Sequence, residues 1–499
     1  MKTNTKIIVS LLAGVLSASA LVACSTSSGG GSKNKFEISI SARSMVSEQN
    51  MLNIWKKAYE EKHPNVTVKV NGWGSSEGTS EDYIMKNALN RSKLTDMLYT
   101  TDDSTAMLAT KKNFVDLRPY YESSAETDYS NYYSTMLDTT SFYGEFRPTT
   151  KYTGSLDVEK SDDAQYGVYF APREYNMPAL LCNVSLFKQY VATDEEKTNW
   201  NKDTLQNIWL RLADESEWNW DTFVKGLKAL SDICVDLNAT GDRGFRGCEL
   251  NQKWEPVYTT IMKDLGSDGI FTMDDHAETH FNLNSEKNKQ ILSKIVNDFG
   301  KNAGKRYMID TDDANQNFSY RTAFSVVVSY PEVGNYYEAF KKVDYEIDAL
   351  PFPAEYVGAG CGGYAILKDN ENEVQKISTG ETAKTVDLCW DFLKFIISEE
   401  GQNLAGKEGY IQPVLKKLAD SGDWLESYDG KINNAAFANK NAKELRLDVF
   451  CFAEPEKRKD LRIEVGAVFF NNLFKPDKET YVDLLDTATK NVNDILGRQ

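Results

Sequence analysis

The sequence predicts an α/β protein with at least two domains. Its 499 residues are too many for a single hydrophobic core. After residue 35, segments with the period of a strand alternate with segments with the period of a helix, in the order strand, helix, strand, helix, strand. That order is typical of a doubly wound domain built on a mainly parallel sheet.

The first three elements are defined by their apolar periods. Residues 36–40 (FEISI) alternate apolar and polar side chains, which predicts a strand. Residues 66–70 (VTVKV) predict the next strand in the same way. Between them His63-Pro64 should end a helix, because a residue before proline avoids the helical backbone. The apolar face of that helix consists of Met51, Ile54, Trp55 and Ala58.

Three further elements follow from the same patterns. A second helix is expected over about 81–90 and a third strand over 96–99. Near the C-terminal end, Ser398-Glu-Glu-Gly401 is expected to end another helix, with glycine just past the last turn. The apolar face of that helix consists of Val386, Cys389, Trp390, Leu393 and Ile396.

The first 32 residues have the pattern of a secretory signal and a tether. Lys2 and Lys6 precede a short apolar run at 7–20, and Cys24 directly follows Leu-Val-Ala, as in the lipobox of bacterial lipoproteins. We expect a signal peptide at 1–23, acylation (palmitate) of Cys24, and a flexible linker at 24–35. The mature protein would then be extracytoplasmic and held to the cell membrane only by its lipid. An ordinary signal peptide with a chance cysteine is the alternative.

The charge of the chain excludes one class of partner. Without the two lysines of the signal peptide, 55 basic residues face 74 acidic ones, so the mature net charge is 55 − 74 = −19. Such a chain repels nucleic acid and anionic lipid surfaces. Six cysteines remain after Cys24, mostly as expected small buried hydrophobes, and Cys234 and Cys248 flank one loop as the best candidate disulfide.

Seven segments, taken in their order, resemble one protein family. The family is that of the family 1 extracellular solute-binding proteins of ABC importers, the relatives of maltose-binding protein. The stretch from GGYAILKDN to FLKFIISEEGQNLAGKEGYIQPV is the most specific part, whereas Thr95 and Cys182 depart from the family's proline and tyrosine. The segments are 53–70, 95–121, 166–190, 218–230, 317–330, 362–370 and 392–414.

The resemblance implies a periplasmic-binding-protein-like fold with two α/β lobes and a ligand cleft between them. By analogy, residues 36–171 and 317–353 form the first lobe, and residues 172–316 and 354–499 form the second. The implied protein is a monomer without cofactor or catalysis. It captures a carbohydrate, a mono- or oligosaccharide, and presents it to the permease subunits of an ABC transporter.

Candidate ligand contacts lie just after the strands, because ligands of open α/β sheets bind beyond the carboxyl ends of the strands. Aromatic rings and planar carboxylate or guanidinium groups suit a sugar. Tyr330 follows a strand at 324–328, and a glycine-rich turn presents Tyr364. Such tyrosines can equally belong to a core, and Arg173-Glu174 can be a plain ion pair. The full set is Arg43, Trp73, Asp102, Asp103, Arg173, Glu174, Tyr175, Tyr330 and Tyr364.

Metal and enzyme functions are the alternatives. Residues 236–242 space oxygen ligands as an EF-hand loop begins, but Gly247 stands where the bidentate glutamate is needed, so we expect a surface turn and no metal. The segment HAETH at 276–280 lacks the glutamate that follows the first histidine in zinc proteases. A secreted lipoprotein glycoside hydrolase, or a binding protein for a non-sugar polar solute, remains open.

Overall fold

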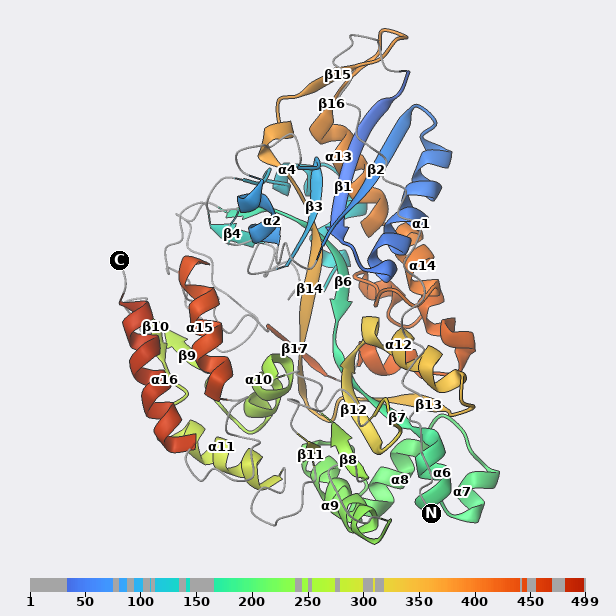
Figure 1. The fold of residues 1–499 in the computed structure, drawn as a ribbon, viewed down its shortest axis with the longest axis vertical. Coiled ribbons are helices and arrows are strands. Elements are labelled where there is room, and N and C mark those ends of the chain that lie inside the picture. Colours follow the sequence, from blue (N-terminus) through green and yellow to red (C-terminus); the bar gives the residue numbers. More distant parts are fainter. Residues whose placement is uncertain are drawn as a thin grey trace, which may run out of the picture.

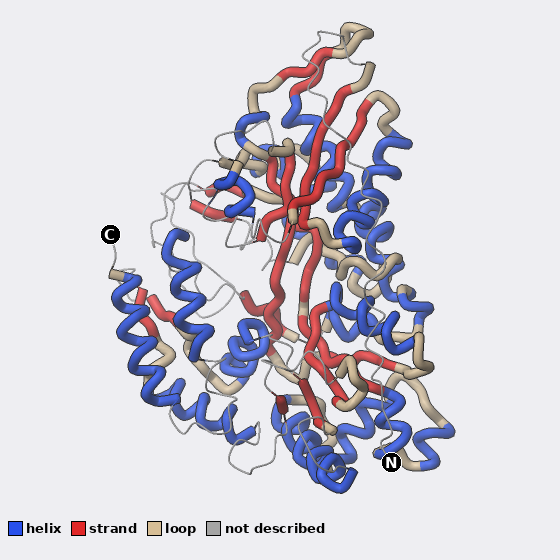
Figure 2. Tube along the Cα trace, viewed as in Figure 1, coloured by secondary structure: helices blue, strands red, loops and turns tan. Residues whose placement is uncertain are grey.

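The fold consists of two lobes stacked along the long axis and joined by strands that run from one to the other (Figures 1 and 2). Along the described residues, no helix is both long and apolar enough to cross a membrane. The computed structural model describes residues 34–74, 80–87, 94–101, 108, 113–133, 141–143, 166–237, 245–249, 254–273, 279–298, 308–309, 318–439, 442–446, 455–468 and 481–497.

The first lobe is built on a six-stranded mixed sheet. Its strands are β1 (Phe36–Arg43), β2 (Val66–Trp73), β3 (Met97–Thr101), β6 (Ala171–Asn176), β14 (Tyr356–Ile366) and β17 (Lys443–Arg446). β2, β1 and β3 lie side by side and parallel, and β14 continues the sheet antiparallel to β3. The three strands expected from the N-terminal pattern are therefore confirmed, and β1 and β2 each extend three residues further than predicted.

Helices cover this sheet on the right-hand side of Figure 1. They include α1 (Val46–Lys62), α13 (Thr385–Ile397) and α14 (Glu399–Lys407), while α2 (Ser80–Lys86) contacts β3. The expected helix end is confirmed, because α13 ends at Ile397 with Ser398 as its C-cap. Gly401 is not the stop, however, since Ser398 also begins α14 by accepting a hydrogen bond from the Gly401 nitrogen. Gly401 also allows a close approach, because a Cβ atom there would lie 2.1 Å from the Phe395 carbonyl oxygen. The Trp55 indole donates to the Gly401 carbonyl oxygen at 2.6 Å.

The second lobe is built on a five-stranded sheet in the order β11-β8-β12-β7-β13. These strands are β7 (Pro178–Asn183), β8 (Arg246–Glu249), β11 (Met308–Ile309), β12 (Ala323–Ser329) and β13 (Ile347–Pro351). β12 is buried along almost its whole length, as expected of a central strand between β7 and β8. The helices of this lobe are α6 (Val184–Tyr190), α7 (Asp194–Thr198), α8 (Thr204–Ala213), α9 (Trp220–Leu237) and α12 (Tyr330–Lys341).

A group of helices with one small hairpin lies on the left of the second lobe in Figure 1. Within it α15 packs on α16, and α10 contacts β14. The elements are α10 (Trp254–Asp264), β9 (Phe271–Met273), β10 (Thr279–Phe281), α11 (Glu286–Asp298), α15 (Pro455–Val468) and α16 (Tyr481–Leu496). Short elements elsewhere include α4 (Arg118–Tyr121) and the hairpins β4 (Ser141–Tyr143) with β5 (Tyr166–Val168), and β15 (Val374–Lys376) with β16 (Thr382–Lys384).

Two chain segments carry the sheet hydrogen bonding from one lobe to the other. The first passes from β6 to β7 through Met177, and the second passes from β13 to β14. Gln412 ties the first crossing to a later segment: it accepts a hydrogen bond from the Met177 nitrogen at 3.2 Å and donates one to the Phe437 carbonyl at 2.8 Å. Few covalent connections between lobes are what a hinge requires.

The expected lobe boundaries need correction at more than one place. The segment 317–353, which analogy assigned to the first lobe, contributes β12 and β13 to the sheet of the second. The chain then returns, and β14, α13 and α14 pack in the first lobe. The crossing also comes at Met177, after β6, and not at residue 171. The assignment failed because β12 and β13 pair with β7, more than 100 residues earlier in the chain, and the apolar spacing within a segment does not show which distant strand it pairs with.

Candidate ligand-binding site

Charged and aromatic side chains gather where the carboxyl ends of the parallel strands meet the crossing strands. Arg43 and Trp73 are register partners at the ends of β1 and β2. Thr101 ends β3 and is paired with Gly362 of β14, and Gly362 is paired with Glu174 of β6. The register therefore brings four of the expected candidates, Arg43, Trp73, Arg173 and Glu174, to one edge of the sheet.

Two arginines and two glutamates form the polar part of this edge, which we call the arginine cluster (Arg43, Glu48, Arg173 and Glu174). The Arg173 guanidinium binds Glu174 at two points, with Nη2–Oε1 at 2.6 Å and Nε–Oε2 at 3.1 Å. Arg43 donates to Glu48 Oε1 through Nε at 3.0 Å and through Nη2. Arg173 Nη1 lies 3.9 Å from the same Glu48 oxygen, so both arginines converge on one carboxylate.

The phenol ring of Tyr99 lies beneath both guanidinium groups. The guanidinium carbons of Arg173 and Arg43 are 4.3 Å and 5.3 Å from its ring centroid, within the range of a cation–π contact. Burial raises the pKa of Tyr99, so this ring stays neutral at physiological pH. Burial alone would lower the pKa of Arg173, but the Glu174 carboxylate and the nearby phenols hold it well above its usual range.

Only one member of the arginine cluster is open to solvent. The side chain of Arg43 is 48% exposed, whereas those of Glu48, Arg173 and Glu174 are at most 6% exposed. Glu48 Oε2, Trp73 Nε1 and Arg173 Nη1 are buried at this edge and have no hydrogen-bond partner among the described residues. A buried acceptor and a buried donor without partners are costly in a folded protein and are common where a ligand or water completes the site.

Glycine in β14 makes room for this arrangement. A Cβ atom at Gly362 would lie 2.3 Å from the Tyr99 hydroxyl, which no real contact allows. The expectation of a glycine-rich turn here is wrong, because Gly362 and Gly363 lie inside β14, at a shift in its register with β6. Because Gly362 and Gly363 carry no side chains, the Tyr99 ring can lie close to the backbone in the middle of β14.

Tyr364 and Tyr175 lie close to the cluster but beneath it. Tyr364 is fully buried, packed edge-on against Trp55 and Tyr99, and burial raises its pKa to about 12. Tyr175 is also fully buried and stacks on Tyr133 with centroids 4.0 Å apart. In this conformation both rings support the site from within and offer no face to a ligand.

Tyr330 lies elsewhere, so its expected role as a stacking plate is not supported. It begins α12 in the second lobe, is fully buried, and packs against Trp424 and Phe437. Its hydroxyl is 2.6 Å from the Ser427 hydroxyl, so the polar end is satisfied within the core. A tyrosine after a strand has the same sequence pattern whether its ring faces a cleft or a core. Asp102 and Asp103 lie outside the described residues.

Two residues of the site were not predicted. Glu48 lies in the first turn of α1, a position common for acids because it faces the positive end of the helix dipole. Tyr99 lies inside β3, where the first four residues of the strand are all buried, and such a strand favours a core role. One feature of the sequence could have identified Glu48: it lies in the first turn of the helix that directly follows β1, and ligands of such sheets bind in this region.

The expected disulfide is wrong. Cys234 on α9 and Cys248 on β8 are both free and buried, as are Cys182 and Cys389, and burial raises the pKa of each thiol. The described residues contain no group of three or more histidine, cysteine, aspartate or glutamate side chains placed to hold a metal. Cys24, the loop 238–244 and most of the HAETH segment lie outside the described part of the chain.

Solved structures of substrate-binding and sugar-binding proteins have a similar fold. They include the ABC substrate-binding protein Lmo0181 from Listeria monocytogenes in complex with cycloalternan (14% identity, TM-score 0.61, covering 93% of this chain and 100% of that one). The sugar-binding protein MalE from Xanthomonas citri is similar at 11% identity (TM-score 0.62, 92% and 97%). UgpB from Mycobacterium tuberculosis in complex with glycerophosphocholine is similar at 13% identity (TM-score 0.60, 94% and 100%).

The family of this chain is shown by its sequence and not by the structural neighbours. At these low identities, the structural neighbours show the two-lobed fold alone. Among curated proteins no sequence match was found. A sequence model of the bacterial extracellular solute-binding proteins, however, matches residues 55–431, which is most of the chain. The chain therefore belongs to the bacterial extracellular solute-binding protein family.

Proposed function

We propose that this protein is the substrate-binding lipoprotein of an ABC importer for a mono- or oligosaccharide. The ligand would bind between the lobes, against the arginine cluster, and closure of the lobes would trap it. The bound form would then be delivered to permease subunits in the membrane. The acyl chain on Cys24 would keep a monomeric protein near that permease, outside the cell membrane.

The observation that carries this proposal is the exposed guanidinium of Arg43 above the Tyr99 ring. It lies at the carboxyl ends of parallel strands, which is where open α/β sheets bind ligands. A planar guanidinium can donate two parallel hydrogen bonds to neighbouring hydroxyls of a sugar. The buried ion pair of Arg173 with Glu174 underneath fixes the geometry, because bound partners leave these side chains little rotational freedom.

Two further observations support carbohydrate as the ligand class. Glu48 Oε2 and Trp73 Nε1 are an unpaired acceptor and an unpaired donor close to Arg43. They are buried in this conformation, and a shift of the side chains on ligand binding would let them serve hydroxyl groups, which both donate and accept. The proteins of similar fold include complexes with cycloalternan and maltotetraose, and a sugar-binding protein. One of similar fold holds glycerophosphocholine, so a non-sugar polar solute is an outcome that the experiment must be able to reveal.

Calorimetric titration of Arg43→Ala tests the site. With a saccharide that binds the wild type, the variant should bind about 10 to 100 times more weakly, the range for losing a charged hydrogen bond. The change also takes both Arg43 hydrogen bonds from the buried Glu48 carboxylate, so the stability of the variant is measured by urea denaturation and the titration is run where the variant is folded. Arg211→Ala is the matched control: Arg211 is 42% exposed and pairs with Glu196 in the second lobe, far from the cluster in sequence and fold.

The same titration separates a binding protein from a glycoside hydrolase. Oligosaccharide incubated with the wild-type protein should be recovered intact after binding, as judged by chromatography of the sugar. Release of shorter sugars would favour the hydrolase. Equal affinity of the wild type and Arg43→Ala would remove the arginine cluster from the ligand site.

A further inference from the structure

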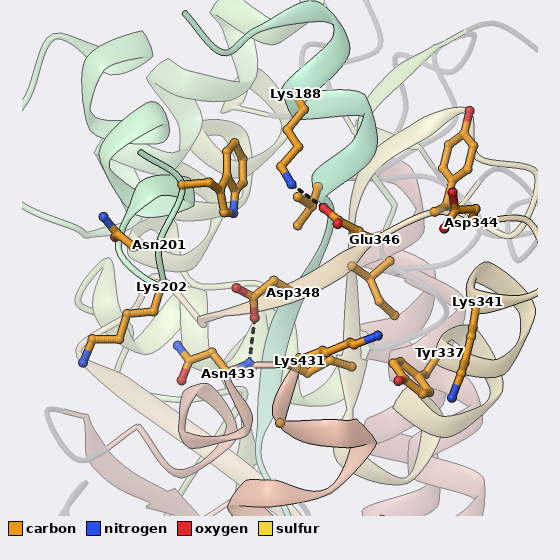
Figure 3. Close-up of a pocket in the computed structure, with 16 residues that line it drawn as sticks. Lys188, Asn201, Lys202, Tyr337, Lys341, Asp344, Glu346, Asp348, Lys431 and Asn433 are labelled. Atoms are coloured by element: carbon orange, nitrogen blue, oxygen red, sulfur yellow. Dashed lines mark hydrogen bonds and ion pairs between the residues drawn. The ribbon is translucent and has the colours of Figure 1, made fainter. Parts of the chain in front are cut away.

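A second pocket lies on the second lobe, apart from the arginine cluster. Its volume is about 580 Å³, within the range of small-molecule sites. It is bounded by α6, by the loop between α7 and α8, by α12 with the start of β13, and by residues 430–433 (Figure 3). No residue of β1, β2, β3, β6 or β14 lines it, so it is not part of the site proposed above.

We propose that this pocket is a second saccharide-binding site. The inference is independent of what the cleft binds, because it rests only on the side chains of the pocket. Three features support it: an aromatic ring, a carboxylate with a free oxygen, and a balance of charge that favours a neutral ligand.

The aromatic ring is that of Trp200, between α7 and α8. Trp200 is half-buried, and the ammonium group of Lys188 lies 4.9 Å from its ring centroid. Lys188 in turn forms an ion pair with Glu346, at the other wall of the pocket (Figure 3). These contacts hold the indole in a fixed position, and a fixed aromatic face is what the apolar face of a sugar ring packs on.

The carboxylate is that of Asp348 in β13. Its Oδ1 accepts two backbone hydrogen bonds, from Asn433 at 2.6 Å and from Ala349 at 2.8 Å. Its other oxygen makes no hydrogen bond within the described residues, and Figure 3 shows it on the side of the strand where Asn201 and Lys202 lie. One oxygen thus fixes the group while the other is available to accept from ligand hydroxyls.

The charges of the pocket balance. Lys188 is neutralised by Glu346, and Lys341 is neutralised by Asp429 at 3.1 Å. Two lysines, Lys202 and Lys431, then remain without an ion pair among the described residues, against two acids, Asp344 and Asp348. A strongly cationic or anionic ligand would therefore gain little, whereas a neutral polyhydroxyl ligand could use both the donors and the acceptors.

All walls of this pocket belong to one lobe. A hinge motion between the lobes leaves distances within a lobe unchanged. Saccharide should therefore bind here whether the lobes are open or closed, and occupancy of this site alone should not close them.

Fluorine NMR of protein labelled with 5-fluorotryptophan tests the proposal. The Trp200 resonance is assigned by its loss in Trp200→Phe, and that of Trp73 by its loss in Trp73→Phe. Maltotetraose, cellotetraose and xylotetraose are titrated one at a time, with spermidine and glucose 1-phosphate as charged probes. We expect at least one neutral tetrasaccharide to move the Trp200 resonance, and neither charged probe to do so.

Asp348→Asn provides the second arm, because it keeps the shape of the side chain and an oxygen for the two backbone donors. We expect about tenfold weaker binding at the Trp200 resonance, the order for weakening one charged hydrogen bond. Asp194→Asn, an exposed acid on α7 outside the pocket, should leave binding unchanged.

Each outcome decides something definite. A Trp200 resonance that no neutral saccharide moves overturns the second site, whatever Trp73 reports about the cleft. Movement by spermidine or glucose 1-phosphate alone also overturns it, because the ligand class is then wrong. Movement of Trp200 without Trp73 supports the second site and counts against the sugar ligand proposed for the cleft.

Discussion

Arg173 and Glu174 are neighbours in the chain, and their side chains form a two-point ion pair inside the protein. Adjacent residues of a regular strand face opposite sides, so this pair requires the irregular pairing of β6 with β14 beside it. The pair also connects to Glu48 and, through that carboxylate, to the exposed Arg43. The structure thus links a buried ion pair to the one solvent-facing member of the candidate site.

Removal of the buried guanidinium should be strongly destabilising. Arg173→Met leaves the Glu174 and Glu48 carboxylates buried without their shared counterion, and the expected loss is about 3–5 kcal/mol in the free energy of unfolding. Urea denaturation measures it. The control is Arg118→Met, which breaks an ion pair with Asp116 in which Arg118 is 41% exposed and should cost about 0–1 kcal/mol. Equal losses in the two variants would mean that the cluster is not an electrostatic unit.

A methyl group at Gly362 should disturb the site through Tyr99. The Cβ atom of Gly362→Ala would lie 2.3 Å from the Tyr99 hydroxyl, so the ring or the strand must move, at a cost of about 1–3 kcal/mol. Thermal unfolding measures the loss, and combining the change with Tyr99→Phe should recover part of it, because the nearest atom is then gone. Gly334→Ala on α12 meets no atom closer than 3.4 Å and should not destabilise. Additive effects of the two changes would contradict the proposed clash.

Glu249 should make stability depend on pH. It is fully buried at the end of β8, close to Tyr336, and burial raises its pKa from 4.5 to about 7 even though the Phe318 nitrogen donates to it. The folded state therefore keeps a proton that the unfolded chain releases at lower pH. The contribution to stability is complete below about pH 4.5, falls as the pH rises towards 7, and is constant above that.

Glu249→Gln removes this titration while keeping an oxygen for the Phe318 nitrogen. Urea denaturation at a series of pH values should show a shallower fall in stability between pH 4.5 and 7 for the variant than for the wild type. The absolute stability of the variant does not matter for this test. Parallel pH profiles of the two proteins would show that Glu249 does not keep its proton in the folded state.

The proposed lipid anchor would depend on one thiol, that of Cys24. Cys24→Ala should prevent acylation, because the thiol is the group that carries the lipid, and the variant should move to the aqueous phase in detergent partitioning. The wild type should stay with the detergent. Equal partitioning of the two proteins would rule out the lipobox interpretation and favour an ordinary signal peptide.

The spacing of apolar residues predicted individual strands and helices well. It could not predict which strands pair when they are far apart in the sequence. The strands β1 and β2, the helix α1 with its end before Pro64, and the apolar face of α13 all follow from the spacing of apolar residues. The position of β12 in the second sheet does not follow from such spacing, because a mostly apolar strand fits the centre of either sheet. The family resemblance provided the two-lobed fold, which periodicity alone could not distinguish from other α/β folds.

The candidate site was predicted in part for the same reason. Arg43 and Trp73 come together because the ends of parallel strands share one edge of the sheet, which is a rule of topology. Arg173 and Glu174 reach the same edge from the middle of β6, through its antiparallel pairing with β14. Tyr330 and Tyr364 turned inward, and the direction of a ring depends on what packs around it. The pairing of Cys234 with Cys248 failed similarly, since two cysteines near one loop can still end as separate buried thiols.

A thermal-shift screen of the mature protein against classes of solute tests the central claim most directly. Neutral mono- and oligosaccharides, amino acids, peptides, polyamines and glycerophosphodiesters would each be tested alone. A ligand at a hundredfold over its dissociation constant adds about 2.7 kcal/mol of stability, which is an easily measured rise in the melting temperature. We predict that at least one saccharide raises the melting temperature and that the rise is smaller in Arg43→Ala. A rise with a member of another class, and with no saccharide, would contradict the proposed function.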